Sequence, residues 1–88
     1  MTVLIIEAES FNTPGRIMRA AADKARAAEI AAELCNAVLD EWPEDGGGEK
    51  PGPATPGNWE EVADCIFNAD GGGSAYVIVS QLEVEAPK

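Results

Sequence analysis

The sequence predicts a single-domain α/β protein of the α+β type, in which two strands flank one long and one short helix in the order β-α-α-β. Two short apolar runs, one near each end of the chain, have the composition of strands. Between them, apolar residues recur at helical spacing in two segments, which a stretch rich in proline and glycine separates. The 88 residues are enough for one hydrophobic core, so a single domain is expected over 1–88.

The first strand and the long helix are expected in the N-terminal half. Val3-Leu4-Ile5-Ile6 is apolar and rich in β-branched residues, and this strand is expected to continue through Glu9. Thr13-Pro14 predicts a helix start, because a threonine hydroxyl can cap free amides and proline is tolerated at the first helical position. The helix is expected to reach Trp42, with an apolar face of Ile17, Ala20, Ala21, Ala27, Ala28, Ala31, Leu34, Cys35, Val38 and Trp42.

A flexible linker is predicted at 43–58, which contains four prolines and five glycines and almost nothing apolar. Asn58, followed three residues later by Glu61, resembles a capping box and predicts the start of the short helix. Its apolar face consists of Trp59, Val62, Ala63, Ile66 and Phe67. The run Asp70-Gly71-Gly72-Gly73 is expected to end it.

The second strand is predicted from Ala75 to Val84, with Tyr76 and Ile78 on one face and Val77 on the other. Short connections would reverse the chain at each step, so the two strands are expected to be antiparallel neighbours with both helices on one face. A two-stranded sheet is marginal alone and has two open edges. Either the linker hides a third strand or another chain uses an edge, and we favour the second.

Charge is the strongest compositional feature. The net charge is −10, and it is unevenly distributed, because residues 1–28 carry +1 and residues 29–88 carry −11. Direct binding to nucleic acid or to an anionic membrane is therefore disfavoured, and a basic protein surface is the favoured partner. The alternative is that the acidity only keeps a small protein in solution.

The sequence offers no recognisable catalytic apparatus. It has no histidine, the commonest general base and transition-metal ligand. Cys35 and Cys65 fall on predicted apolar helix faces, so we expect two buried, reduced thiols in a cytoplasmic protein. The run Gly71-Gly72-Gly73 follows a helix and lacks a lysine after it, which is the wrong order for a phosphate loop. We expect no enzyme activity, no cofactor and no metal.

Two groups of carboxylates are the candidate partner-binding residues. The first group, where the long helix meets the linker, consists of Asp40, Glu41, Glu44, Asp45 and Glu49. The second group, at the start of the short helix, consists of Glu60, Glu61 and Asp64. Arg16 and Arg19 are expected at the N-terminal end of the long helix, where the macrodipole disfavours cations. Either this arrangement is chance or these charges face a partner. Carboxylates spread over a surface can imitate the phosphates of a nucleic acid.

In length, charge, compact layout and missing catalytic residues, the chain resembles the small acidic inhibitors encoded by phages, and the anti-CRISPR proteins in particular. The resemblance implies a monomer or small oligomer that acts as a DNA mimic and blocks a nucleic-acid-binding complex by occupying its DNA-binding groove. The cations Arg16, Arg19, Lys24 and Arg26 depart from a purely acidic mimic, so a mixed protein-docking surface is an equal alternative. A homodimer is left open. The alternative is a structural or assembly protein, such as a phage particle component, that associates through its strand edges.

Overall fold

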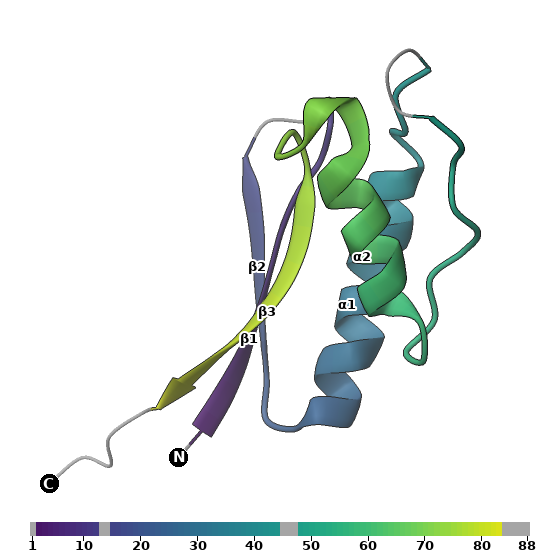
Figure 1. Cartoon of the computed structure of the whole chain (residues 1–88). Helices are drawn as coiled ribbons and strands as arrows, with labels where there is room; N and C mark the ends of the chain where they lie inside the picture. Colours follow the sequence, from purple (N-terminus) through teal and green to yellow (C-terminus); the bar gives the residue numbers. More distant parts are fainter. Residues whose placement is uncertain (1, 13–14, 45–47, 84–88) are drawn as a thin grey trace, which may run out of the picture.

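The computed structural model describes residues 2–12, 15–44 and 48–83, which form a three-stranded antiparallel sheet with two helices on one of its faces (Figure 1). The elements, in chain order, are β1 (Thr2–Glu9), β2 (Arg16–Ala21), α1 (Lys24–Leu39), α2 (Trp59–Asn68), a 3-10 turn (Ala69–Gly71) and β3 (Tyr76–Glu83). The α+β class is confirmed, and the two-stranded sheet is corrected to three strands.

The missing strand lies in the segment that was predicted as the start of the long helix. β1 is the central strand, and β2 pairs with it from Leu4 opposite Ala21 to Glu9 opposite Arg16. The predicted cap at Thr13-Pro14 lies outside the described residues. The helix itself begins after Asp23, whose carboxylate accepts a 2.8 Å hydrogen bond from the Arg26 amide. Pairing with β1 therefore overrides a local pattern that also suits a helix.

The two faces of the sheet have different surroundings. Leu4, Ile6 and Ala8 of β1 are buried beneath the helices, together with Val77 of β3. The residues between them point the other way, because side chains alternate along a strand. This second face, which we call the open sheet face, leaves three large apolar side chains exposed: Met18, Ile78 and Leu82.

The helices run in the same direction, from the end of the sheet near Ala21 toward the opposite end (Figure 1). Between the end of α1 and the start of α2, the chain returns along the outside of the helix layer (Figure 1). The expectation that the chain direction reverses at every connection is therefore wrong for the two helices. Side chains of both helices meet the sheet in one core, in which Ile6, Cys35 and Ile66 are fully buried.

The connection at 43–58 has no helix or strand in its described part, but the Asn36 side chain anchors it to α1. The Asn36 side chain accepts a 2.8 Å hydrogen bond from the amide of Ala54 and donates a 3.0 Å bond to its carbonyl. Ala54 is buried. The predicted flexibility of the linker stays a prediction, now with an expected exception at Ala54.

We expect Asn36→Ala to lower the free energy of unfolding by about 1–3 kcal/mol, because two backbone groups of Ala54 lose their partner. Hydrogen exchange at the Ala54 amide should be slow in the parent and fast in the variant. Asn68→Ala is the matched control, since the Asn68 side chain is exposed and donates to the Asp64 carbonyl of its own helix. Fast exchange at Ala54 in the parent would contradict the anchoring.

α2 begins at Trp59 as predicted, but the capping box is not formed. The Asn58 side chain makes no cap hydrogen bond to the helix and accepts one from the Thr55 amide at 2.6 Å. The helix ends where the glycine run was expected to end it. The amide of Gly73 bonds the Phe67 carbonyl at 2.8 Å, and its φ of 81° suits glycine.

Candidate protein-binding surface

The first carboxylate group lies at the end of α1 and along the connection. Asp40, Glu44 and Glu49 are exposed, and Asp40 is the C-cap residue of α1. Glu41 is half-buried and accepts a hydrogen bond from the Ser10 hydroxyl, so it also joins α1 to the turn after β1. Asp45 lies outside the described residues. Three of the five predicted residues are thus exposed carboxylates.

The second carboxylate group lies in the first half of α2. Glu60 and Glu61 occupy its first turn, and Asp64 follows one turn later; all three are exposed. Acids in the first turn of a helix are favoured by its macrodipole. These side chains are therefore stabilised where they are, while still facing solvent.

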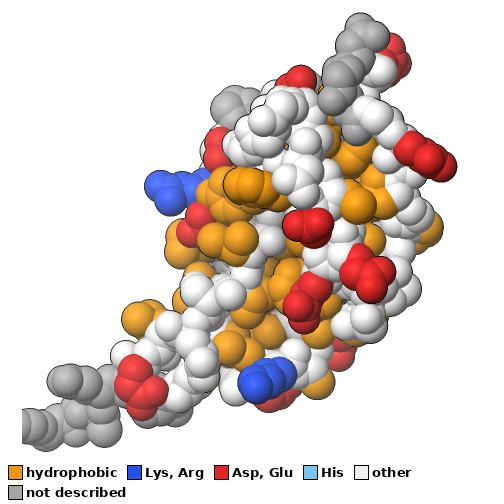
Figure 2. Space-filling model, in the orientation of Figure 1, with side chains coloured by type: hydrophobic (Ala, Val, Ile, Leu, Met, Phe, Trp, Pro, Cys, Tyr) orange, Lys and Arg blue, Asp and Glu red, His pale blue; other side chains and the backbone are white. Residues whose placement is uncertain are grey.

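The structure does not bring the two groups together. The start of α2 lies beside the middle of α1 and not at the far end of the helix layer, because the Trp59 carbonyl is 3.7 Å from the Cys35 sulfur (Figure 1). Asp40 borders one hollow along the connection and Glu61 borders another, and Pro51 lines both, so the connection separates the two groups. Acidic side chains are seen beside hydrophobic ones across the face in Figure 2. The carboxylates form a spread surface instead of one pocket.

The expected placement of two cations is wrong. Arg16 and Arg19 belong to strand β2, so they are not at the N-terminus of the long helix and do not oppose its dipole. The first turn of α1 holds Lys24 and Arg26 instead, and Arg26 makes an exposed ion pair with Glu29 at 3.1 Å. The positions of these two arginines on β2 therefore give no support to a partner at the start of the helix.

A hollow between α2 and β3 was not anticipated. We call it the α2–β3 groove: Trp59, Ala63 and Phe67 line it on the helix side, and residues 76–79 line it on the strand side. Glu60 and Asp64 also border it. Phe67 is 52% exposed, whereas Trp59 is partly buried against the core. The sequence pattern had placed both aromatic residues on the apolar face of the helix, but it could not show that a free strand edge lies beside them.

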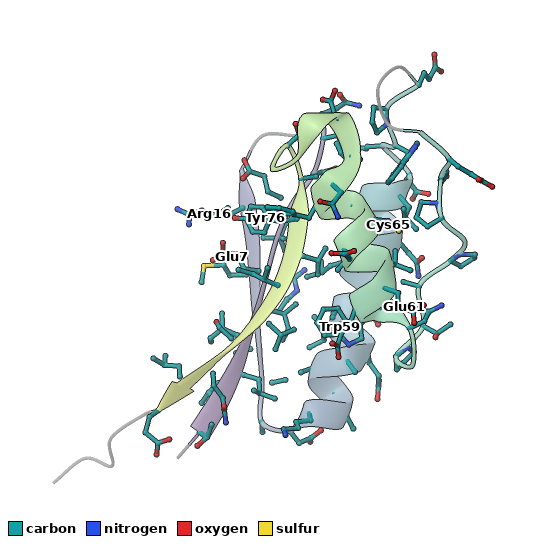
Figure 3. The ribbon with its side chains drawn as sticks, in the orientation of Figure 1. Glu7, Arg16, Trp59, Glu61, Cys65 and Tyr76 are labelled. Atoms are coloured by element: carbon teal, nitrogen blue, oxygen red, sulfur yellow. The ribbon has the colours of Figure 1, made fainter. Side chains whose placement is uncertain are left out.

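A polar cluster crosses all three strands on the open sheet face. The Glu7 carboxylate accepts a 2.6 Å hydrogen bond from the Tyr76 hydroxyl and lies 3.8 Å from the Arg16 guanidinium (Figure 3). This hydrogen bond raises the pKa of Tyr76. The pairing Glu9–Arg16 and Glu9–Tyr76 places a second acid at the same end of the face. The cluster ties both outer strands to β1, and no sequence motif marked it.

The two cysteines have different environments. Cys35 is buried in the core, as expected, and burial raises the pKa of its thiol to about 12. Cys65 is exposed, which corrects the expectation that both are buried. Val62 and Ile66 lie on the buried side of α2. Cys65 precedes Ile66 and is therefore rotated about 100° around the helix axis from it, which leaves its side chain exposed.

Within residues 2–12, 15–44 and 48–83, no group of three or more aspartate, glutamate or cysteine side chains is arranged to hold a metal ion. Neither helix in that part of the chain has the length and apolar character needed to cross a membrane. Comparisons with family models, with curated proteins and with solved structures give no significant match to this chain.

Proposed function

We propose that this protein is a non-enzymatic inhibitor that binds a basic protein surface through carboxylates of its helix layer. One observation supports this most directly: residues 29–64, which form most of that layer and its connection, contain ten acids and a single base, Lys50. The open sheet face, in contrast, combines Glu7 and Glu9 with Arg16. Apart from Lys24 and Arg26 in the first turn of α1, the helix layer is therefore the more negative side of the molecule.

The favoured partner is a protein or complex that normally binds nucleic acid. The exposed acids of α1, from Glu29 to Asp40, extend over about 16 Å of helix, a length comparable to about five base pairs of duplex DNA. A groove that binds phosphates also attracts a surface of this charge, and the attraction speeds encounter. The resemblance to anti-CRISPR proteins supports the same class of partner. Direct binding of this chain to nucleic acid is disfavoured by its charge.

Neutralising the first carboxylate group should weaken the complex without unfolding the chain. A partner captured on the immobilised protein should be released by a short DNA duplex and by rising salt. We expect Asp40→Asn, Glu44→Gln and Glu49→Gln together to raise the Kd of that partner by about tenfold or more at low salt.

The matched control removes three charges elsewhere, with Glu9→Gln, Asp70→Asn and Glu83→Gln. It should change the Kd far less, while both variants keep the melting temperature of the parent within a few degrees. An unchanged Kd in the first variant, or binding by the parent that is independent of salt, would reject a carboxylate interface.

Assembly through strand edges is the second candidate function. β2 and β3 are the outer strands of the sheet, and each has one edge without a neighbouring strand among the residues that the structure describes. Sedimentation over a wide concentration range distinguishes the two functions, because assembly requires a concentration-dependent increase in mass and the inhibitor as proposed does not.

A further inference from the structure

The two free edges of the sheet differ in charge. β2 carries Arg16 and Arg19 among its six residues. β3 has no charged residue from Tyr76 to Leu82, and its centre, Val77-Ile78-Val79, is β-branched. Charged side chains on an edge strand discourage pairing with another chain. The edge of β3 lacks this protection over seven consecutive residues and is the edge better suited to accept a further strand.

The α2–β3 groove runs beside this edge. Trp59, Ala63 and Phe67 are four residues apart on α2, so they follow one another along one side of the helix. The small Ala63 lies between the two aromatic residues and lines the groove with them. The groove holds a hollow of about 310 Å³, and a second hollow of about 470 Å³, which shares Trp59, Glu60 and Val79 with it, continues toward Leu4 and Pro56.

The spacing of the groove suits an extended peptide. Side chains on one face of a strand repeat about every 6.8 Å. Four residues of α2 advance about 6 Å along the helix axis. A strand added to β3 would therefore place successive side chains of its helix-facing side near Trp59, Ala63 and Phe67 in turn. Its backbone would pair with the outward amides and carbonyls of β3.

We infer, on the basis of the protein-binding function proposed above, that the α2–β3 groove binds an extended segment of the partner as a fourth strand next to β3. The segment carries an apolar side chain that packs on Ala63 between Trp59 and Phe67. It also carries a lysine or arginine two positions away. The cation is selected by Glu60 and Asp64, which are exposed at the border of the groove. Lys24 borders the second hollow and would repel a cation there. The cation of the peptide is therefore expected near Asp64, at the end of the groove away from Lys24.

A second copy of this chain fits the groove less well. The β3 strand of another copy offers no cation between Tyr76 and Leu82 to meet Glu60 and Asp64. Two chains that each carry a charge of −10 also repel one another. The hollow at the other edge of the sheet, between α1 and β2, is bordered by Arg16 of the protected strand. A basic extended peptide is therefore the favoured occupant.

The test is selection from a display library of random peptides long enough to span β3, panned against the whole chain. The selected peptides should alternate β-branched or aromatic residues with polar ones and be enriched in lysine and arginine. On binding, the backbone amides of Tyr76 to Leu82 and the Trp59 indole should show the largest NMR shifts. Replacing alternate peptide residues by proline should abolish binding, because proline cannot donate to a strand ladder.

Matched variants locate the site. Phe67→Ser should weaken peptide binding by about tenfold or more, whereas Met18→Ser, at a side chain of similar exposure on the open sheet face, should not. Asp64→Lys should also weaken it, and Glu33→Lys, which changes the net charge equally, should not.

Three outcomes would each overturn the inference: no peptides are selected, the NMR shifts are confined to β2 or the open sheet face, or this chain forms a dimer that Phe67→Ser dissociates. Two measurements separate this site from the wider carboxylate surface. Phe67→Ser should lose peptide binding, while the triple variant at Asp40, Glu44 and Glu49 should still weaken binding of the basic partner.

Discussion

Ile6→Ala is expected to lower the free energy of unfolding by about 2–5 kcal/mol. Ile6 lies on the central strand with none of its surface exposed, so removing its side-chain atoms leaves a cavity between the sheet and both helices. A domain of this length is expected to have a total stability of about 4–13 kcal/mol. The variant should therefore lose a large share of that stability, with a fall in melting temperature of about 10 °C or more.

Ile78→Ala is the matched control for this experiment. Ile78 is on the neighbouring strand but on the open sheet face, and 48% of it is exposed. Its removal should cost less than about 1 kcal/mol. Urea unfolding followed by tryptophan fluorescence measures both. Equal losses, or a loss in Ile78→Ala that grows with protein concentration, would show that the open sheet face is covered and not free.

Much of the fold follows from local patterns in the sequence. The strands β1 and β3 were predicted within one or two residues, because the β-branched runs at Val3 and Tyr76 have no competing helical pattern. The alternation in β3 also assigned its faces correctly. α2 was predicted because its apolar residues recur at helical spacing and glycine follows it. Each of these signals depends only on neighbouring residues.

The failure at β2 has a specific cause. Arg16 to Ala21 contains arginine, methionine and alanine, which are good helix formers, and its apolar residues continue the spacing of α1. The segment is a strand because β1 is the central strand and needs a second neighbour to complete the sheet. That requirement involves residues on another strand, so no local pattern contains it. The error also moved Arg16 and Arg19 onto the wrong element.

The candidate site was predicted only in part for the same reason. Exposure of Asp40, Glu60 and Asp64 could be expected from their charge and from their positions on the helices. The α2–β3 groove could not, because it depends on which strand is at the edge and on which helix covers it. The pattern identified Trp59 and Phe67 as residues of the apolar face of α2. Only the structure shows that β3 lies beside them and that both line a groove.

The two thiols provide the second large expected effect, because they should differ in alkylation rate by at least about a hundredfold in the native protein. The thiolate is the reactive form, and a thiol with a pKa of about 12, as burial produces at Cys35, is about one part in ten thousand thiolate at pH 8. Cys35 also has none of its surface exposed and lies 3.7 Å from the Trp59 carbonyl. Cys65 is exposed on α2 and open to reagent.

Labelling with iodoacetamide, quenched at intervals and mapped by mass spectrometry, should therefore modify Cys65 first and Cys35 only as the chain opens. Raising the pH from 7 to 9 should increase the Cys35 thiolate about a hundredfold and still leave it a small minority, because its pKa lies well above that range. In urea the two rates should converge, since unfolding removes the burial that raises the pKa. Ile6→Ala should accelerate only Cys35, because it makes opening of the shared core more frequent. Rapid labelling of both cysteines in the folded parent would contradict the packing of α1 against the sheet.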